Sequence, residues 1–401
     1  MKIAIIGGGA SGFFAAISAK THRPNANVVI FEKSQKLLAK VKVSGGGRCN
    51  VTNGTSSISE LCTAYPRGGK QLKKAFHQFN TVHTKEWFES RGVDLYTQDD
   101  GRVFPKSDNS QSIIDCLMEE VKSLGIGIDL GNSVTRIDPT DDWVDLHFGS
   151  TVKRFENVIV ATGGSAKKES LIWLEELGHE IMDPVPSLFT FKLPNDPISE
   201  LMGLSVEKGI VKIQGTKLRS EGPLLITHWG MSGPAILKLS AFGARILNKL
   251  NYQFNVQVNW VGEQNSEIVG QELFDQIKNH PKKQIGNSKL FNLPERLWVF
   301  LLNKSKLNPD KPWAEIGQKS VNRLIELLTN DVYHAKGKTT FKEEFVTCGG
   351  VSLQSINMNT MQSKVYPTLY FSGEVMDVDG ITGGYNFQAA WTTGFIAGQL
   401  K

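Results

Sequence analysis

The sequence predicts an α/β protein in which a parallel sheet with helices is interrupted by an inserted β-rich part and a small helical part. Three observations lead to this fold class. A short apolar strand runs into a glycine-rich turn and a helix at the start of the chain, and a second strand, turn and helix come at its end. Between them, from about residue 188 to 342, alternating strands are followed by helices. A chain of 401 residues has room for two or three domains.

The composition is that of an ordinary globular protein, with 40% hydrophobic and 21% charged residues. The formal net charge is +5, and Lys and Arg are interleaved with Asp and Glu along the chain. This pattern is typical of a solvated surface, whereas nucleic-acid binding requires a concentrated basic patch. We therefore expect a small-molecule substrate and no nucleic-acid partner.

The cysteines and histidines argue against a metal or disulfide protein. Cys49, Cys62, Cys116 and Cys348 are widely spaced, without a CxxC pair, which favours a reducing cytoplasm. The eight histidines lie singly, so no metal site is predicted. No window of 18 apolar residues occurs, so no membrane span is expected either.

The first glycine-rich stretch, GGGASG at 7–12, follows the apolar run KIAII at 2–6. A helix is predicted over 10–20, and a second apolar run at 28–31 ends in Glu32. Strand, glycine turn, helix, strand and acid in this order form the context in which GxGxxG indicates dinucleotide binding.

Each residue type in this motif has a physical reason. Gly7 permits the tight turn, Gly9 lets the backbone approach a pyrophosphate, and Gly12 lets helix and strand pack closely. The helix N-terminus offers N–H groups and a positive dipole end to phosphates, and Glu32 can accept hydrogen bonds from ribose hydroxyls. The residues predicted at this end of the ligand are Gly7, Gly9, Ala10, Ser11, Gly12, Glu32 and Lys33.

The remainder of the chain favours FAD over NAD. A late strand at 158–161 runs into a TGG turn, and another at 369–373 leads through an acidic loop to the turn GGYN and a helix over 387–399. The N–H groups after Gly383 suit the N1/O2 edge of a flavin, which gains negative charge on reduction. The predicted contacts are Thr162, Gly163, Gly164, Gly373, Glu374, Asp377, Gly383, Gly384, Tyr385 and Asn386.

A second glycine-rich stretch, VSGGGRCNVTN at 43–53, is expected to cross the same ligand near its reactive ring, because its glycines allow close backbone approach. Cys49 has two interpretations, a redox-active thiol or a small residue in a packed loop. The second is favoured, since no resolving cysteine lies nearby. Arg48 could pair with a phosphate or with a substrate anion, and Asn50 and Asn53 could bind the ribityl chain or hold the loop. The predicted contacts are Lys40, Ser44, Gly45, Gly46, Arg48, Cys49 and Asn50.

The inserted region is expected to hold the substrate against the flavin. Its predicted strands are 188–193, 206–213, 224–229 and 252–260, and its predicted helices are 264–279, 294–303 and 312–330. The corresponding domains are a cofactor domain over 1–187 and 343–401, a β-rich part over 188–262 with 331–342, and a helical part over 263–330.

Two residues are candidate catalytic acids or bases. His228 lies in ITHWGMSGPAIL, on a tight turn before a helix, where the alternative is a histidine that only hydrogen-bonds its turn. Ser232 in the same stretch is expected to cap that helix. Tyr385 lies in the GGYN turn that should abut the flavin.

Four stretches together carry a family resemblance: VSGGGRCNVTN, GRVFP at 101–105, THWGMSGPAIL at 227–237 and SGEVMDVDGITGGYNFQAA at 372–390. They resemble the bacterial family of FAD-containing oxidoreductases that includes aminoacetone oxidase. The resemblance implies a Rossmann-like, glutathione-reductase-type FAD domain with an inserted β-barrel-like domain and a small helical domain.

The sequence thus predicts an FAD-dependent oxidoreductase that transfers hydride between flavin N5 and a small organic substrate. NAD(P)H could serve as donor and O₂ as acceptor. Because only one GxGxxG occurs, NAD(P)H is expected to bind transiently at most. A tRNA-modifying flavoprotein and a non-catalytic flavin sensor are the alternatives.

Overall fold

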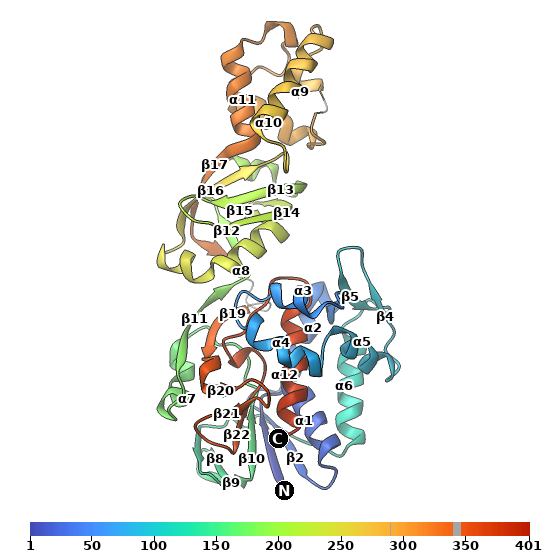
Figure 1. The fold of residues 1–401 in the computed structure, drawn as a ribbon, viewed down its shortest axis with the longest axis vertical. Helices are drawn as coiled ribbons and strands as arrows, with labels where there is room; N and C mark the ends of the chain where they lie inside the picture. Colours follow the sequence, from blue (N-terminus) through green and yellow to red (C-terminus); the bar gives the residue numbers. More distant parts are fainter. Residues whose placement is uncertain (289, 340–345) are drawn as a thin grey trace. The chain divides into compact units, whose positions relative to one another are not determined.

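A computed structural model describes residues 1–288, 290–339 and 346–401. The chain divides into two compact units, Met1–Ser187 with Phe341–Lys401 and Leu188–Thr340 (Figure 1). The expected domain boundary at residues 342 and 343 lies outside the described residues.

The first unit is built on a seven-stranded sheet with the order β20-β21-β22-β10-β1-β2-β6. Its five strands from β22 to β6 are parallel, as expected for short, apolar strands covered on both faces. The strands are β1 (Lys2–Ile6), β2 (Asn27–Glu32), β6 (Gly127–Leu130), β10 (Asn157–Val160), β20 (Ile356–Asn357), β21 (Gln362–Ser363) and β22 (Leu369–Phe371).

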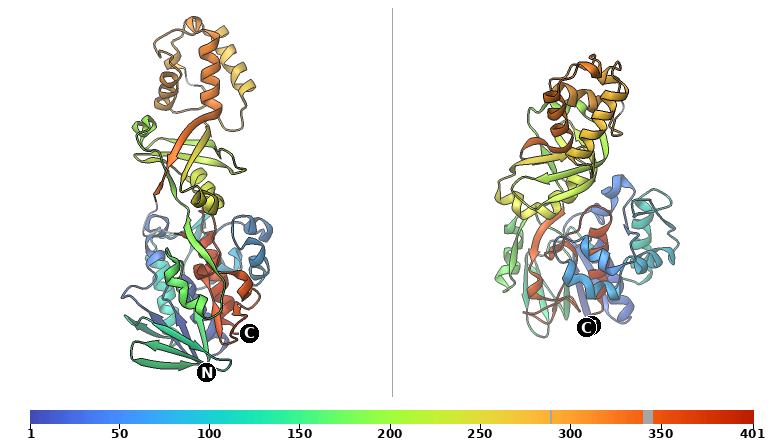
Figure 2. Two further views of the ribbon diagram at one scale, coloured as in Figure 1. Left: turned by 90° about the vertical axis from the view of Figure 1, so that its left-hand side faces the viewer. Right: turned by 45° about the horizontal axis from the view of Figure 1, so that its top comes forward.

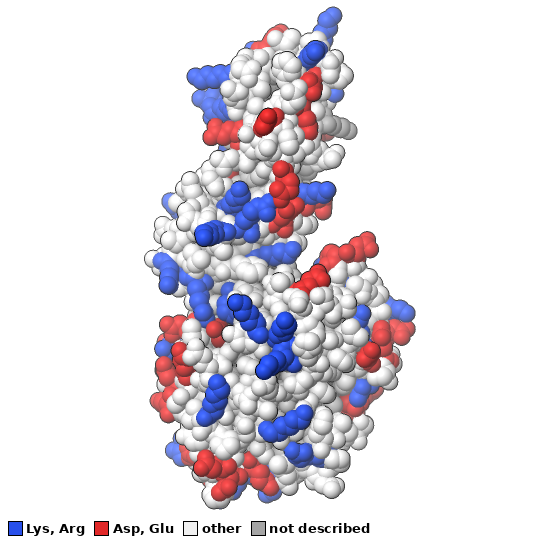
Figure 3. Space-filling model, viewed as in Figure 1, with Lys and Arg blue, Asp and Glu red and all other residues white. Residues whose placement is uncertain are grey.

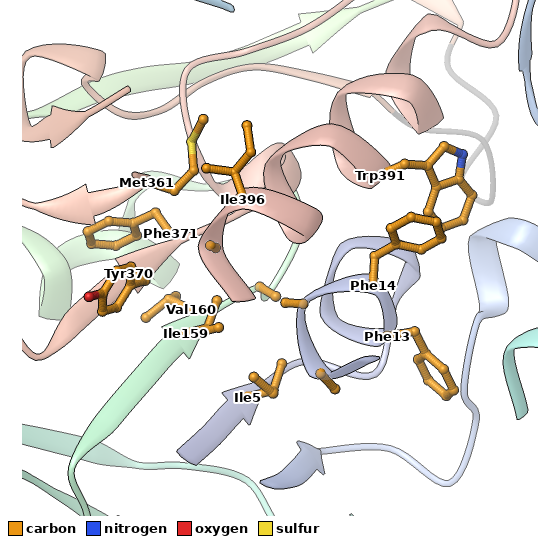
Figure 4. Packing of buried hydrophobic residues seen from close by; sticks show 14 of the residues in the cluster. Ile5, Phe13, Phe14, Ile159, Val160, Met361, Tyr370, Phe371, Trp391 and Ile396 are labelled. Atoms are coloured by element: carbon orange, nitrogen blue, oxygen red, sulfur yellow. The ribbon is translucent and has the colours of Figure 1, made fainter. Parts of the chain in front are cut away.

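Two long helices from opposite ends of the chain pack tightly in this unit. They are α1 (Ala10–His22) and α12 (Tyr385–Gly398). A Cβ at Gly394 would lie 2.6 Å from Ser11 O, so only glycine allows this approach. The Phe14 and Trp391 rings, with centroids 4.8 Å apart, fill the space beside the contact (Figure 4). The two ends of the chain are therefore held in one core.

The other elements of this unit surround the sheet. The helices are α2 (Ala39–Val43), α3 (Ile58–Thr63), α4 (Gly69–Gln78), α5 (Thr81–Glu89), α6 (Gln111–Ser123) and α7 (Ile172–Glu176). Three small antiparallel sheets complete it: β3 (Thr52–Asn53), β5 (Arg102–Pro105) and β4 (Leu95–Thr97); β7 (Arg136–Pro139), β8 (Val144–Phe148) and β9 (Thr151–Phe155); β11 (Ile181–Ser187) and β19 (Val346–Val351).

The second unit has its own seven-stranded sheet, in the order β17-β16-β13-β14-β15-β12-β18, and its own core. Within this unit the three helices α9, α10 and α11 gather at one end, and α11 leads directly into β17 (Figure 2). The elements are β12 (Thr190–Lys192), β13 (Ser205–Ile213), β14 (Arg219–Thr227), β15 (Gly230–Ser232), α8 (Pro234–Lys249), β16 (Gln253–Asn259), α9 (Ser266–Asn279), α10 (Glu295–Lys304), α11 (Gln318–Asn330), β17 (Asp331–Lys336) and β18 (Lys338–Thr339).

One local prediction in this unit is wrong. Ser232 does not cap α8, because the N-cap position is taken by Gly233, whose φ of 92° a serine would rarely adopt. Ser232 instead ends β15 and pairs with Leu225 across the sheet.

No helix in residues 1–288, 290–339 and 346–401 is long and apolar enough to cross a membrane. In the same part of the chain, no three His, Cys, Asp or Glu side chains are grouped so as to hold a metal ion.

Candidate cofactor site

The first glycine loop lies at the carboxyl ends of β1 and β10, where the two strands run side by side. A Cβ at Gly7 would lie 2.3 Å from Ala161 O, and one at Gly12 would lie 2.0 Å from Gly7 O. Both positions therefore exclude any side chain. The structure thus brings the GxGxxG loop directly against the ATGG turn, which is 150 residues further along the sequence.

Other glycines face open space. Gly9, Gly46, Gly47 and Gly163 have no atom within 4 Å of the point where a Cβ would be. Gly9 is also the N-cap of α1, and no side chain caps that helix. Its first N–H groups are available to a ligand, as in dinucleotide-binding proteins. These residues fit the pyrophosphate of FAD.

Glu32 is held at the end of β2 by two backbone N–H groups. Its carboxylate accepts from Gly8 N and from Ser34 N, both at 2.9 Å. An ionised carboxylate has about four acceptor sites, so capacity remains for ribose hydroxyls. The neighbouring Lys33 is exposed.

An ion pair connects three segments that are distant in sequence. Lys40 Nζ lies 2.6 Å from Glu374 Oε2, and Glu374 Oε1 accepts from Thr347 N at 2.8 Å. A Cβ at Gly164 would lie 2.6 Å from the Glu374 carboxyl. Lys40, the TGG turn and Glu374 are therefore neighbours, as a shared ligand requires.

The second glycine loop depends on glycine for its backbone shape. Gly45, Gly46 and Gly47 have φ values of 58°, 69° and 85° in succession. Arg48 places its guanidinium 4.1 Å from the centre of the Phe104 ring and 3.7 Å from Asp108. Packing against this ring is what the structure records for Arg48, and its contact to a phosphate stays a prediction.

Polar side chains fix the GGYN turn to the second loop. Asn53 Nδ2 donates to Gly383 O at 3.1 Å. When the side-chain amide of Asn50 is oriented so that both its oxygen and its nitrogen have hydrogen-bond partners, the oxygen accepts from Gly384 N at 3.0 Å. Asn386 forms a pair of hydrogen bonds with Gly380. The asparagines hold the loops themselves, which is one of the two roles expected of them.

The start of α12, like that of α1, has no capping side chain. Its N-cap, Gly384, has a φ of 89°, and neither a capping side chain nor an acidic residue is present in the first turn. Tyr385 follows, half-buried against Tyr65, whose hydroxyl donates to Tyr385 O at 2.7 Å. Burial raises the pKa of Tyr385 above its usual value, so its phenol stays protonated near neutral pH.

A family model described as the HI0933-like protein Rossmann domain matches residues 1–400. The chain belongs to the HI0933-like family. The predicted fold class, a Rossmann-like FAD-binding domain with inserted parts, is confirmed by this match, and with it the FAD-dependent oxidoreductase character of the family.

Two curated relatives align over nearly the whole HI0933-like chain. A 3-dehydro-bile acid delta(4,6)-reductase of Clostridium scindens is 28% identical over 99% of this chain and 98% of its own. A ribosomal RNA dihydrouridine synthase of Escherichia coli is 30% identical over 98% of this chain and 96% of its own. They show the family, and the resemblance to aminoacetone oxidase stays a prediction.

A solved structure shares the fold at low identity. It is a 3-ketosteroid delta1-dehydrogenase from Sterolibacterium denitrificans, with a TM-score of 0.52 and 12% identity over 99% of this chain and 98% of that one. At this identity the likeness shows the fold alone.

Cys49 in this HI0933-like chain is a packed residue. Its side chain is buried, and burial raises the pKa of its thiol to about 12, although a hydrogen bond to Ser44 opposes the rise. A thiolate is therefore scarce at neutral pH. We expect a Cys49→Ser protein to keep its FAD and its rate of substrate reduction within about twofold, measured by flavin reoxidation. A variant that held FAD but had lost all reductive chemistry would contradict this.

His228 lies in the second unit, at the hairpin between β14 and β15. It is exposed, and its ring centre is 4.1 Å from that of Trp229. No hydrogen bond of its side chain occurs among the described residues, so the expected bond to its own turn is not seen. Its catalytic role stays a prediction.

Sequence reasoning missed a buried ion pair near the GGYN turn. Arg67 donates through Nε to Asp379 Oδ1 at 2.5 Å and through Nη2 to Asp379 Oδ2, which also accepts from Ser187 Oγ at 2.7 Å. Asp377, the contact predicted two residues earlier, lines a pocket beside α4, and its contact to the cofactor stays a prediction. The only sequence feature that could have indicated this ion pair is the stretch DVDG at 377–380, which contains both Asp377 and Asp379.

Proposed function

We propose that this protein is an FAD-dependent reductase of a carbon–carbon double bond conjugated to a carbonyl group. The observation that carries this proposal is that both full-length relatives bear names of such a reaction. A dienone of a bile acid and the uracil ring of uridine share an electron-poor double bond next to a carbonyl. The residues of the glycine loops fit the cofactor this chemistry needs.

Reduction adds a hydride to the β-carbon and a proton to the α-carbon. Reduced FAD, when bound, supplies the hydride from N5. The backbone at Gly9 and Gly163 would hold the phosphates of the bound cofactor, and the N–H groups at the start of α12 would stabilise the flavin edge that becomes negative. NAD(P)H is the proposed source of the electrons, bound transiently.

Tyr385 is the proposed proton donor. It begins α12, its phenol is kept protonated by burial, and no partner of its hydroxyl occurs among the described residues. His228 is the second candidate, carried by the inserted unit, where a substrate-contacting residue is expected.

The proposal is tested with purified protein in two steps. Heat release should yield FAD, and the flavin reduced by NADH or NADPH should be reoxidised anaerobically by 2-cyclohexenone, by a 3-keto-4,6-diene steroid, or by uridine in RNA. Reoxidation by at least one of these acceptors supports the proposal. Reduced flavin that persists with every one, while O₂ still reoxidises it, rejects the proposal.

We expect Tyr385→Phe to lower the rate of acceptor reduction by about 10²-fold without changing FAD content, since a positioned general acid contributes that much. Tyr366→Phe, another half-buried tyrosine, is the matched control and should keep the full rate. His228→Gln is measured in parallel. If it alone abolishes the reaction and Tyr385→Phe is unaffected, His228 holds the proton.

A further inference from the structure

A strip of positive charge covers the exposed face of α4. Lys70, Lys73, Lys74 and His77 are all exposed on this helix, and residues 66–78 contain no acidic side chain. Figure 3 shows the Lys and Arg side chains gathered over α4 on the viewed face, with no acidic side chain among them.

A pocket of about 570 Å³ opens beside the strip. One wall is the start of α4 with Arg67 and Lys70, and the other is the segment of Ser352, Leu353 and Gln354. Lys364 adds a cation on that second side, because its Nζ donates to Gln354 O at 2.8 Å. The pocket is therefore flanked by lysines from two segments nearly 300 residues apart.

The pocket shares a wall with the GGYN turn. Tyr65 lines the pocket, donates to Tyr385 O, and lies against Gly380, where a Cβ would be 3.2 Å from its ring. Whatever binds beside α4 is thus one buried side chain away from the residues expected around the flavin.

The arrangement of the charge indicates the kind of ligand. Lys70 and His77 are seven residues apart on one helix, which is roughly 10 Å at 1.5 Å per residue. That length exceeds a single phosphate and fits successive phosphates of a strand. A small organic acid carries one charge and needs one or two cations, so four lysines point to a polyanion. The pocket volume admits one nucleoside.

We propose that α4 and the adjoining pocket bind single-stranded RNA, with backbone phosphates on Lys70, Lys73, Lys74 and Lys364 and one nucleoside in the pocket. This inference rests on the proposed function, since it names RNA as the bearer of the conjugated double bond. It differs from the expectation, drawn from overall composition, that no nucleic acid would bind, and the experiment below decides between the two.

The test compares two proteins of equal net charge. One is Lys73→Glu/Lys74→Glu, and the matched control is Lys122→Glu/Lys217→Glu, which changes two lysines that are exposed elsewhere. Holoprotein is titrated with a labelled uridine-rich RNA strand at several salt concentrations. The strip variant should bind at least tenfold more weakly at 0.1 M salt, with a salt slope lower by about 1.4 for two lost contacts. The control should bind like the unmodified protein.

Further arms separate the possibilities. An abasic strand of equal length should bind the unmodified protein at least fivefold more weakly, because its phosphates remain but the pocket is unfilled. Equal RNA affinity in the strip variant and the unmodified protein, or an equal loss in the control, would overturn the proposal. The proposal would also be overturned if the Lys73→Glu/Lys74→Glu protein lost NADPH binding but bound RNA as tightly as the unmodified protein. Reoxidation of the reduced flavin by the three acceptors named above is followed in all proteins. Its absence with every acceptor in every protein overturns the proposed function, whereas RNA binding is measured without turnover.

Discussion

A Gly9→Asp protein is expected to fold normally and to contain no FAD. Gly9 has φ −94° and ψ −173°, an extended conformation that any residue adopts, and nothing lies within 4 Å of its missing Cβ. The position is the N-cap of α1, where an aspartate is favourable and would stabilise the apoprotein by only about a few tenths of a kcal/mol relative to glycine. The new carboxylate would, however, occupy the place of the pyrophosphate and repel it.

The measurement is the flavin absorbance of the purified variant, together with thermal unfolding of the variant and of apoprotein stripped of FAD. Gly317→Asp is the matched control, because Gly317 is likewise an N-cap with φ −76° and open space around it, on α11 of the second unit. It should keep its FAD. A Gly9→Asp protein that retained stoichiometric FAD would show that the pyrophosphate lies elsewhere.

The sequence could predict those parts of the site whose residues all lie within one short segment of the chain. KIAII, the glycines after it and Glu32 are local, and each follows from a strand, a turn or a helix start. The same holds for the TGG and GGYN turns, whose glycines have positive φ or lie too close to a neighbour for a side chain.

The parts that the sequence could not predict join segments far apart. Lys40 and Glu374 are separated by 334 residues, Asn53 and Gly383 by 330, and Arg67 and Asp379 by 312. Nothing in one sequence says which side chain meets which over such distances. The basic strip on α4 is likewise not visible in the net charge of the whole chain, because acidic residues elsewhere offset its lysines.

The two acids of DVDG, Asp377 and Asp379, illustrate a further limit. The segment has isolated bridges at Met376 and Asp379, with a bend at Asp377 between them. Asp377 lines the pocket beside α4, and Asp379 points inward to Arg67 and Ser187. The segment bridges Val351 of β19 at Met376 and Arg67 at Asp379, and the sequence DVDG does not show which acid meets which partner.

An Arg67→Ala protein is expected to lose about 3–5 kcal/mol of unfolding free energy at pH 8, because Asp379 would be left charged and unpaired in the core. Asp379 is fully buried, and the Arg67 side chain is 11% exposed. Arg91→Ala removes an arginine that pairs with Glu120 at the surface and is the control, with an expected loss under about 1 kcal/mol. Denaturant unfolding of the apoproteins measures both.

The pH dependence of this loss identifies its cause. Burial raises the pKa of Asp379 from 3.8 to about 6, even though Arg67 opposes the rise. A carboxyl whose folded pKa is raised binds its proton more tightly when folded, so its contribution to stability falls as the pH rises from about 4 to 6. Without Arg67 the folded pKa rises further, and the deficit of Arg67→Ala should therefore be smaller at pH 5 than at pH 8. Adding Asp379→Asn should restore stability at pH 8 by removing the buried charge. A deficit that is independent of pH, and unchanged in the double variant, would mean that lost packing of the Arg67 side chain, and not the stranded carboxylate, destabilises the protein.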